Sequence, residues 1–103
     1  GNQLEYLWEK SPDTAVLRHE GNQKWYAVLM KISWDKLDKG KEGFVEAVNL
    51  KHDCVTDLLI QRGIYPAFHM NKRYWISLVL DDSLTDDQVL ALLERSWELT
   101  SKK

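Results

Sequence analysis

The sequence predicts one α+β domain, in which two helices pack against an antiparallel sheet. Several short segments are rich in β-branched and aromatic residues, turn residues separate them, and an amphipathic helical pattern closes the chain. A chain of 103 residues with 44% apolar residues suits a single compact domain with its own core. We therefore expect one domain over residues 1–103, in the order strand, strand, strand, helix, strand, helix. Because the first residue is Gly and not Met, two origins are open: the Gly is a cloning scar, or the domain was excised from a longer chain.

The first two strands are predicted to form a hairpin. Residues 14–19 and 24–32 have strand composition, and the "EGNQ" between them supplies the Gly and Asn that tight hairpin turns need for positive φ. The second strand is apolar on both faces, which is typical of a central strand covered on two sides. Strict alternation would place Trp25, Ala27 and Leu29 on one face and Tyr26, Val28, Met30 and Ile32 on the other.

A long loop, a third strand and a short helix come next. The loop covers residues 33–43, the strand covers 44–50 and the helix covers 54–62. Asp53 is the predicted N-cap of the helix, and Gly63 is the residue that ends it in a Schellman motif.

The last two elements are a strand over 75–80 and a helix over 86–99. The strand places Ile76, Leu78 and Leu80 on one face. Thr85 and Gln88 have the spacing of a capping box at the start of the helix. The predicted apolar stripe of the helix consists of Val89, Leu90, Leu93 and Trp97.

Composition narrows the function classes. Fourteen Lys and Arg against sixteen Asp and Glu give a net charge of -2, so a nucleic-acid contact would need a local basic face. The single cysteine, Cys54, rules out an internal disulfide and suits a reducing compartment. No apolar run is long enough to span a bilayer. We expect a soluble cytoplasmic protein without a membrane contact.

Residues with catalytic or metal-binding chemistry are few. Among the metal-ligating candidates, only His52 and Cys54 are close in sequence, and their spacing is unlike that of zinc motifs; the others are His19 and His69. An activated thiol and a small buried hydrophobe are both open for Cys54, and the second is favoured. The common nucleotide, hydrolase and zinc-protease motifs are missing from the sequence. We expect a non-enzymatic domain with no metal and no cofactor.

Positive charge gathers in two stretches. Residues 62–75 contain no Asp or Glu and four basic side chains, Arg62, His69, Lys72 and Arg73, so this stretch suits phosphate groups. Rings for base stacking are available in the same stretch, although Phe68 and Trp75 are assigned to the core. The second group is Lys31, Lys36, Lys39 and Lys41, where acids interrupt the cations and a solvated loop is the favoured interpretation.

The segment "GIYPAFHMNKRYWISLVLDDSLTDDQVLALLERSWEL" resembles the C-terminal signature of the MmcQ/YjbR family, G-x-x-P-x-[YF]-H-M-N-K-x-x-W followed by a strand, an acidic turn and a final helix. "KWYAVLMKI" and "VNLKHDCVTDLL" resemble the family's central strand and its third strand with the following helix. The resemblance covers residues 4–99. It implies a frataxin-like or secretion-chaperone-like α+β fold with an N-terminal helix, for which residues 1–9 are too short here.

The family is described as predicted double-wing DNA-binding proteins, the wings being β-hairpins. The resemblance implies a DNA-binding or regulatory accessory domain whose signature loop supplies His69, Asn71, Lys72 and Arg73. The wing candidates are the turn at Gly21 and Asn22 and the loop 33–43 with Lys36, Lys39 and Lys41.

Two other functions remain open. Composition alone favours a protein–protein interaction module of a larger protein, in which the missing helix leaves an apolar patch for a partner or an upstream domain. A small-molecule pocket around His69 and the loop aromatics is the third hypothesis.

Overall fold

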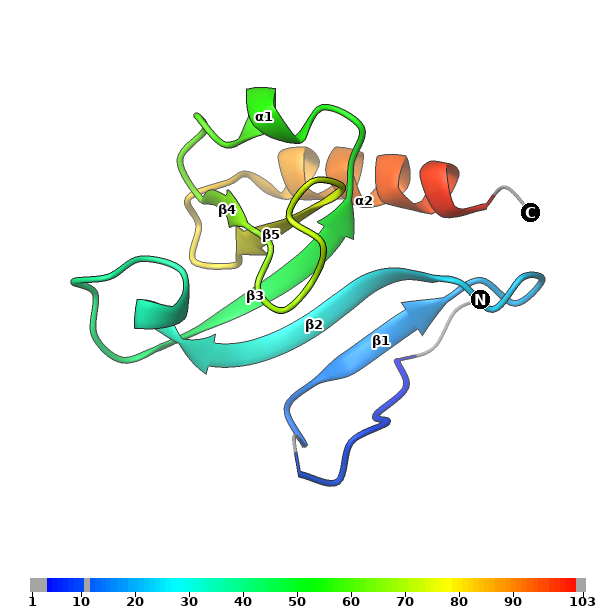
Figure 1. The fold of residues 1–103 in the computed structure, drawn as a ribbon, viewed down its shortest axis with the longest axis horizontal. Helices are drawn as coiled ribbons and strands as arrows, with labels where there is room; N and C mark the ends of the chain where they lie inside the picture. The colour runs from blue at the N-terminus through cyan, green and yellow to red at the C-terminus, as the bar shows by residue number, and fades with distance from the viewer. Residues whose placement is uncertain (1–3, 11, 102–103) are drawn as a thin grey trace.

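A computed structural model describes residues 4–10 and 12–101, which form a five-stranded antiparallel sheet with helices (Figure 1). The spatial order of the strands is β1-β2-β3-β5-β4. The strands are β1 (Ala15–Arg18), β2 (Trp25–Ser33), β3 (Phe44–Lys51), β4 (Ile64–Pro66) and β5 (Trp75–Val79). The helices are α1 (Val55–Leu58) and α2 (Asp86–Thr100), and a 3-10 turn, η1 (Trp34–Lys36), lies in the β2–β3 loop. The predicted α+β class is confirmed.

The two faces of the sheet are covered differently. On the first, which we call the helix face, α2 packs over β2 and β3, and the core between them includes Leu50, Ile76 and Leu78. On the second, which we call the loop face, a smaller cluster of Val16, Val28, Met30 and Ala47 is covered by loop residues. Figure 1 shows the β4–β5 loop crossing in front of β3 and β5 on this side. A site on the loop face is therefore built mainly from loops.

The predicted alternation along β2 is wrong at its start. In the β1–β2 register Arg18 pairs with Trp25, but its neighbour Leu17 pairs with Ala27. One step along β1 therefore corresponds to two steps along β2. This irregularity is a β-bulge, which turns the following side chains over. As a result Tyr26, Ala27 and Leu29 pack on the helix face. Trp25 joins Val28, Met30 and Ile32 on the loop face.

The region after β3 also differs from its prediction. The helix α1 has four residues where nine were expected, and its N-cap is Cys54 and not Asp53. A helix this short gains little from propensity and depends on packing, and Ile60 beyond it is 88% exposed. Gly63 has the predicted positive φ, at 90°, but it precedes a strand, β4, that was not predicted. β4 has three residues at the edge of the sheet, where Pro66 needs no hydrogen-bond partner for its nitrogen.

The β1–β2 turn is bound to the end of α2. Gln23, and not Gly21 or Asn22, adopts the positive φ of this turn. The Asn22 amide donates to the Thr100 carbonyl at 2.9 Å, and the buried His19 Nε2 lies 2.7 Å from Thr100 Oγ1. The β1–β2 turn and the C-terminal end of α2 are therefore connected by hydrogen bonds.

The helix α2 begins as predicted, with a complete capping box between Thr85 and Gln88. Its apolar stripe differs from the predicted one, because Leu92 packs on the core with Val89 and Leu93 whereas Leu90 is 54% exposed. The predicted strand over 75–80 ends at Val79, and Leu80 is exposed. Residues 4–10 contain no helix, and Glu5 pairs with Val16 as an isolated bridge. None of the helices in the described part of the chain has the length and apolar character needed to cross a membrane.

Candidate functional site

The loop between β4 and β5, residues 67–74, contains the signature residues and is anchored on the loop face. Asn49 of β3 donates from its amide to the Phe68 carbonyl at 2.8 Å, and the Phe68 backbone N–H donates to Ser77 Oγ at 3.0 Å. The Ser77 hydroxyl in turn donates to Asn49 Oδ1. Asn49 and Ser77 are buried and opposite each other in the β3–β5 register. A small buried polar network thus fixes the start of the loop.

The second half of the loop is a turn built by Asn71. The Asn71 side chain accepts from the Arg73 N–H at 2.9 Å, and its backbone carbonyl accepts from the N–H groups of Tyr74 and Trp75. This explains the asparagine by turn chemistry. Lys72 and Arg73 are exposed, as predicted, and Arg73 lies 5.9 Å from the Tyr74 ring centroid. The turn holds two adjacent cations toward solvent.

His69 is exposed and has a φ of 57°, in the left-handed region. Histidine is one of the few residues enriched in this region, and non-glycine residues with this conformation cluster at functional sites. Its ring centroid lies 3.9 Å from that of Phe68, and the Phe68 side chain packs on the loop-face cluster. The ring of His69 is therefore placed beside the apolar surface of the sheet.

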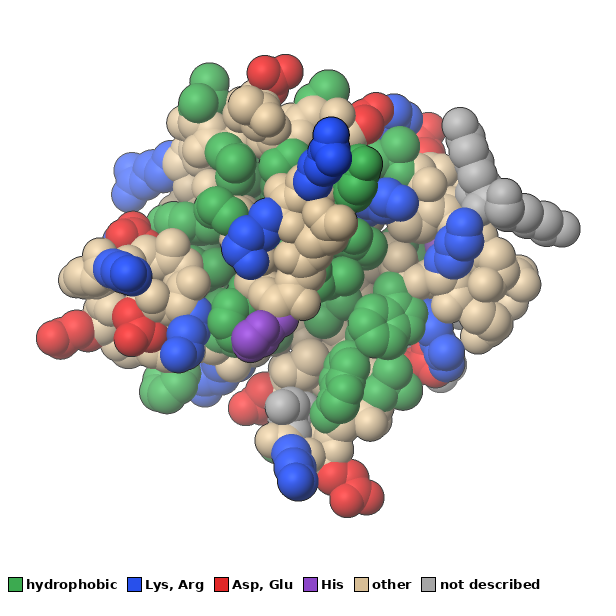
Figure 2. Space-filling model, viewed as in Figure 1, with side chains coloured by type: hydrophobic (Ala, Val, Ile, Leu, Met, Phe, Trp, Pro, Cys, Tyr) green, Lys and Arg blue, Asp and Glu red, His purple; other side chains and the backbone are tan. Residues whose placement is uncertain are grey.

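The lysines of the loop 33–43 are partly engaged within that loop. Lys41 Nζ lies 4.2 Å from the Trp34 ring centroid and 4.0 Å from an Asp38 carboxylate oxygen. Lys36 and Lys39 are exposed. Leu37 of this loop packs against the same cluster as Phe68, so the two basic stretches lie on one face. Figure 2 views the molecule from this side and shows Lys and Arg side chains around the centre, with most Asp and Glu at the margins.

A groove of about 650 Å³ lies on the loop face, between the N-terminal segment, β2 and the β4–β5 loop. Its aromatic lining comes from Trp8, Trp25, Phe68 and His69. Trp8 and Trp25 meet edge to face, with ring centroids 5.7 Å apart. Ligand sites commonly have about 300–1,000 Å³ and mostly apolar walls with a few polar groups. The groove has this size and composition, and in Figure 2 hydrophobic side chains gather on the side of β1.

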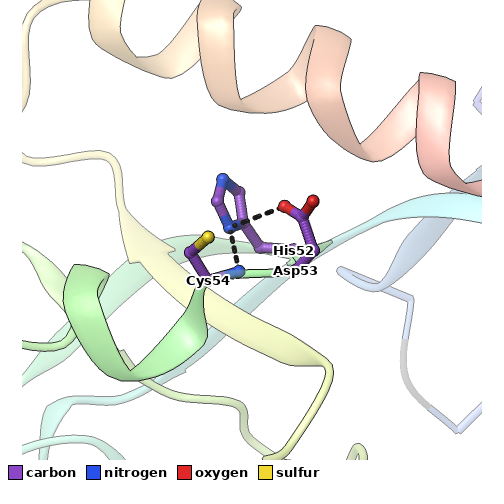
Figure 3. Close-up of side chains that lie close together, drawn as sticks. All are labelled: His52, Asp53 and Cys54. Atoms are coloured by element: carbon purple, nitrogen blue, oxygen red, sulfur yellow. Dashed lines mark hydrogen bonds and ion pairs between the residues drawn. The ribbon is translucent and has the colours of Figure 1, made fainter.

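A second cluster lies away from the groove, at the start of α1. His52, Asp53 and Cys54 place a nitrogen, a carboxylate oxygen and a sulfur within 4.8 Å of one another (Figure 3). His52 Nδ1 already accepts from the Cys54 N–H at 2.8 Å, and Arg95 donates to Asp53 at 2.5 Å. The hydrogen bond from Arg95 lowers the pKa of the Asp53 carboxyl. Two of the three groups are therefore engaged with protein partners. Cys54 is exposed, which contradicts the favoured prediction of a buried hydrophobe.

His52 carries a pH prediction. Burial lowers its pKa, Asp53 raises it and Arg95 lowers it. With a lowered pKa in the folded state, the stability linked to His52 is full above the ordinary value of about 6.5 and is lost as the pH falls through the lower folded pKa. We expect urea unfolding to show a smaller loss of stability between about pH 7 and about pH 5 for His52→Gln than for the wild type. Equal losses in the two proteins would contradict this role of His52.

Only some of the predicted site residues lie at or near the groove. His69 lines the groove, Lys72 and Arg73 follow it in the same loop, and Asn71 shapes the turn. The wing candidate at Gly21 and Asn22 is instead tied to α2 through the Asn22–Thr100 bond. Sequence reasoning missed Trp8 and Asn49. Trp8 had no strand or helix pattern, and Asn49 sits in an apolar strand where a polar residue is a signal for a buried network.

Together these features define a small α+β domain with one helix-covered face and one face that carries a groove and two basic loops. The chain belongs to the YjbR family, whose family model matches residues 1–99. It is similar to the uncharacterized protein YyaQ of Bacillus subtilis, with 36% identity over 97% of this chain and 86% of the relative.

Solved structures have the same fold. A crystal structure of a Pseudomonas syringae protein superposes with a TM-score of 0.93 and 40% identity, covering 96% of this chain and 86% of that one. A Deinococcus radiodurans protein with the family-model domain DUF419 has a TM-score of 0.72 and 21% identity, over 99% of this chain and 70% of that one. The second likeness shows the fold alone.

Proposed function

We propose that this protein is a non-enzymatic DNA-binding or regulatory accessory domain that contacts DNA through the loop face. The observation that supports this proposal most is the loop 67–74, which contains no acid and exposes Lys72 and Arg73 to solvent. Asn49 and Ser77 fix the start of this loop to the sheet. Exposed cations that are held in place can meet phosphates without first being ordered. Lys36, Lys39 and Lys41 extend the contact from the β2–β3 loop on the same face.

Local charge supports a weak, mainly electrostatic contact. The net charge of -2 gives no general attraction for DNA, so binding depends on this face. The acids of α2 lie on the other side of the sheet, as α2 packs on the helix face. DNA that approaches the loop face therefore meets the basic loops first. His69 and Asn71 belong to the same loop, and His69 is its only ring that is exposed on the groove.

Reversing both loop cations tests the proposal. We expect Lys72→Glu with Arg73→Glu to weaken binding to duplex DNA by at least about tenfold at roughly 50 mM salt and to lower the salt slope by about 2. Fluorescence anisotropy across a salt series measures both quantities. The matched control is Lys24→Glu, compared with the single variants Lys72→Glu and Arg73→Glu, because it makes the same charge change on an exposed residue next to the β1–β2 turn. Equal weakening by Lys24→Glu and by the single loop variants would reject a site at the loop.

A protein–protein interaction module is the second candidate function. The observation that favours it is exposed apolar surface on α2, where Leu90 is 54% and Trp97 45% exposed, and the exposed Leu80 lies beside Leu90. Such a surface suits a partner or an upstream domain. If the wild-type protein retains no DNA at about 50 mM salt, the nucleic-acid proposal fails and this candidate takes its place.

A further inference from the structure

We propose that the aromatic groove on the loop face takes the base of one unpaired nucleotide of a DNA single strand. This inference rests on the proposed nucleic-acid function and adds the form of the ligand. The groove would hold the planar base, and the cations that follow it in the β4–β5 loop would hold the neighbouring phosphates.

Aromatic surface from separate parts of the chain lines the groove. Trp8 comes from the N-terminal segment and Trp25 from β2, while Phe68 and His69 come from the β4–β5 loop. Rings supplied by separate segments suit a flat ligand, because every base has a π-face and stacks on any of them. A base inside a duplex is already stacked on its neighbours and does not offer these faces.

The exposure of the rings indicates a ligand that stays partly in water. Trp8 is 38% exposed, and His69, which also lines the groove, is exposed. A base has apolar faces and a polar edge, so it can bury the first and hydrate the second, whereas an aliphatic chain would remain wetted. Met30 and Val28 supply apolar contact from the sheet.

The positive charge next to the groove in the sequence suits a single-stranded nucleic acid better than a neutral aromatic ligand. Met70 is the last loop residue of the lining, and Lys72 and Arg73 follow two and three positions later in the Asn71 turn. Within the groove lining, Lys10 and Lys31 stand against one acid, Asp13. A planar apolar group joined to anionic groups on a flexible backbone is the chemistry of a single-stranded nucleic acid.

Trp8→Ala is the test, with Tyr6→Ala as its matched control. Both rings lie on the same segment and are exposed, but Tyr6 does not line the groove. We expect the wild type to bind an oligothymidine strand more tightly than a duplex. Trp8→Ala should lower the affinity for the strand by about tenfold or more and leave the affinity for the duplex unchanged. Tyr6→Ala should change neither. His69→Asn, which tolerates the same backbone conformation, is a second variant expected to weaken the strand selectively.

A spectroscopic readout places the base directly. In the labelled wild-type protein, the indole N–H signals of Trp8 and Trp25 should shift with oligothymidine, and that of Trp97 on α2 should not. If strand binding depends on Lys72 and Arg73 but is unchanged in Trp8→Ala and His69→Asn, the groove inference fails and the proposed function stands. If thymidine monophosphate binds as tightly as the strand, the ligand is a free nucleotide and the strand assignment fails. If neither duplex nor strand binds, both proposals fail.

Discussion

The Asn49→Ala variant should have a free energy of unfolding about 3 kcal/mol below that of the wild type, because it breaks one buried and one partly buried hydrogen bond and leaves the Ser77 hydroxyl and the Phe68 carbonyl without this partner. For a domain of this size the melting temperature should fall by more than about 10 °C. Urea unfolding followed by far-UV circular dichroism measures the change. A loss below about 1 kcal/mol would show that the network does not anchor the fold.

The matched control is Val48→Ala on the same strand. Val48 is buried but packs on the helix face, so its truncation should also destabilise the protein without touching the loop. The distinguishing measurement is hydrogen exchange at Phe68, whose N–H donates to Ser77. We expect the Asn49 variant to speed exchange there under conditions where the protein is folded, and the Val48 variant to leave it slow.

Replacing Gly63 by Ala should cost about 3 kcal/mol, from two separate causes. Its φ of 90° is a conformation that side chains rarely adopt, which costs about 1–2 kcal/mol. An added Cβ would also lie 2.9 Å from the Ser83 Cβ and 3.2 Å from the Leu84 Cγ, so the β5–α2 connection must move. Thermal and urea unfolding measure the sum.

Two other glycines separate these causes. Gly40 has a φ of 104° but no atom within 4 Å of the position of an added Cβ, so Gly40→Ala should show the conformational cost alone, about 1–2 kcal/mol. Gly21 has neither a positive φ nor a neighbour there, and Gly21→Ala should be close to neutral or slightly stabilising. The same cost at positions 40 and 63 would remove the steric cause.

Local patterns predicted most of this fold because most of its elements carry a local signal. The strands β1, β2, β3 and β5 alternate or run apolar, and α2 has a capping box and an amphipathic pattern. β4 carries no such signal in three residues that include Pro66, and it exists because the edge of β5 offers hydrogen bonds. The bulge opposite Arg18 depends on how two strands meet, so sequence alternation placed Trp25 on the wrong face.

The candidate site was predictable only in part, because it is assembled from distant segments. The loop cations could be located from the acid-free stretch, and their exposure is confirmed. The groove also needs Trp8, which reaches Trp25 because Glu5 pairs with Val16 and with the Arg18 side chain. No local pattern in residues 4–10 predicts this pairing, because the pairing depends on the edge of β1 that faces away from β2.

The bond between His19 and Thr100 joins residues 81 positions apart, and the Asn22 amide reaches the same residue. Contacts this distant in sequence close a long loop, so their formation carries a large loop-closure entropy cost. During synthesis the first hairpin leaves the ribosome long before residue 100, so its turn waits for the last helical turn before it is secured. A nascent chain that has not reached Thr100 therefore lacks both contacts, and its β1–β2 turn is not yet fixed to α2.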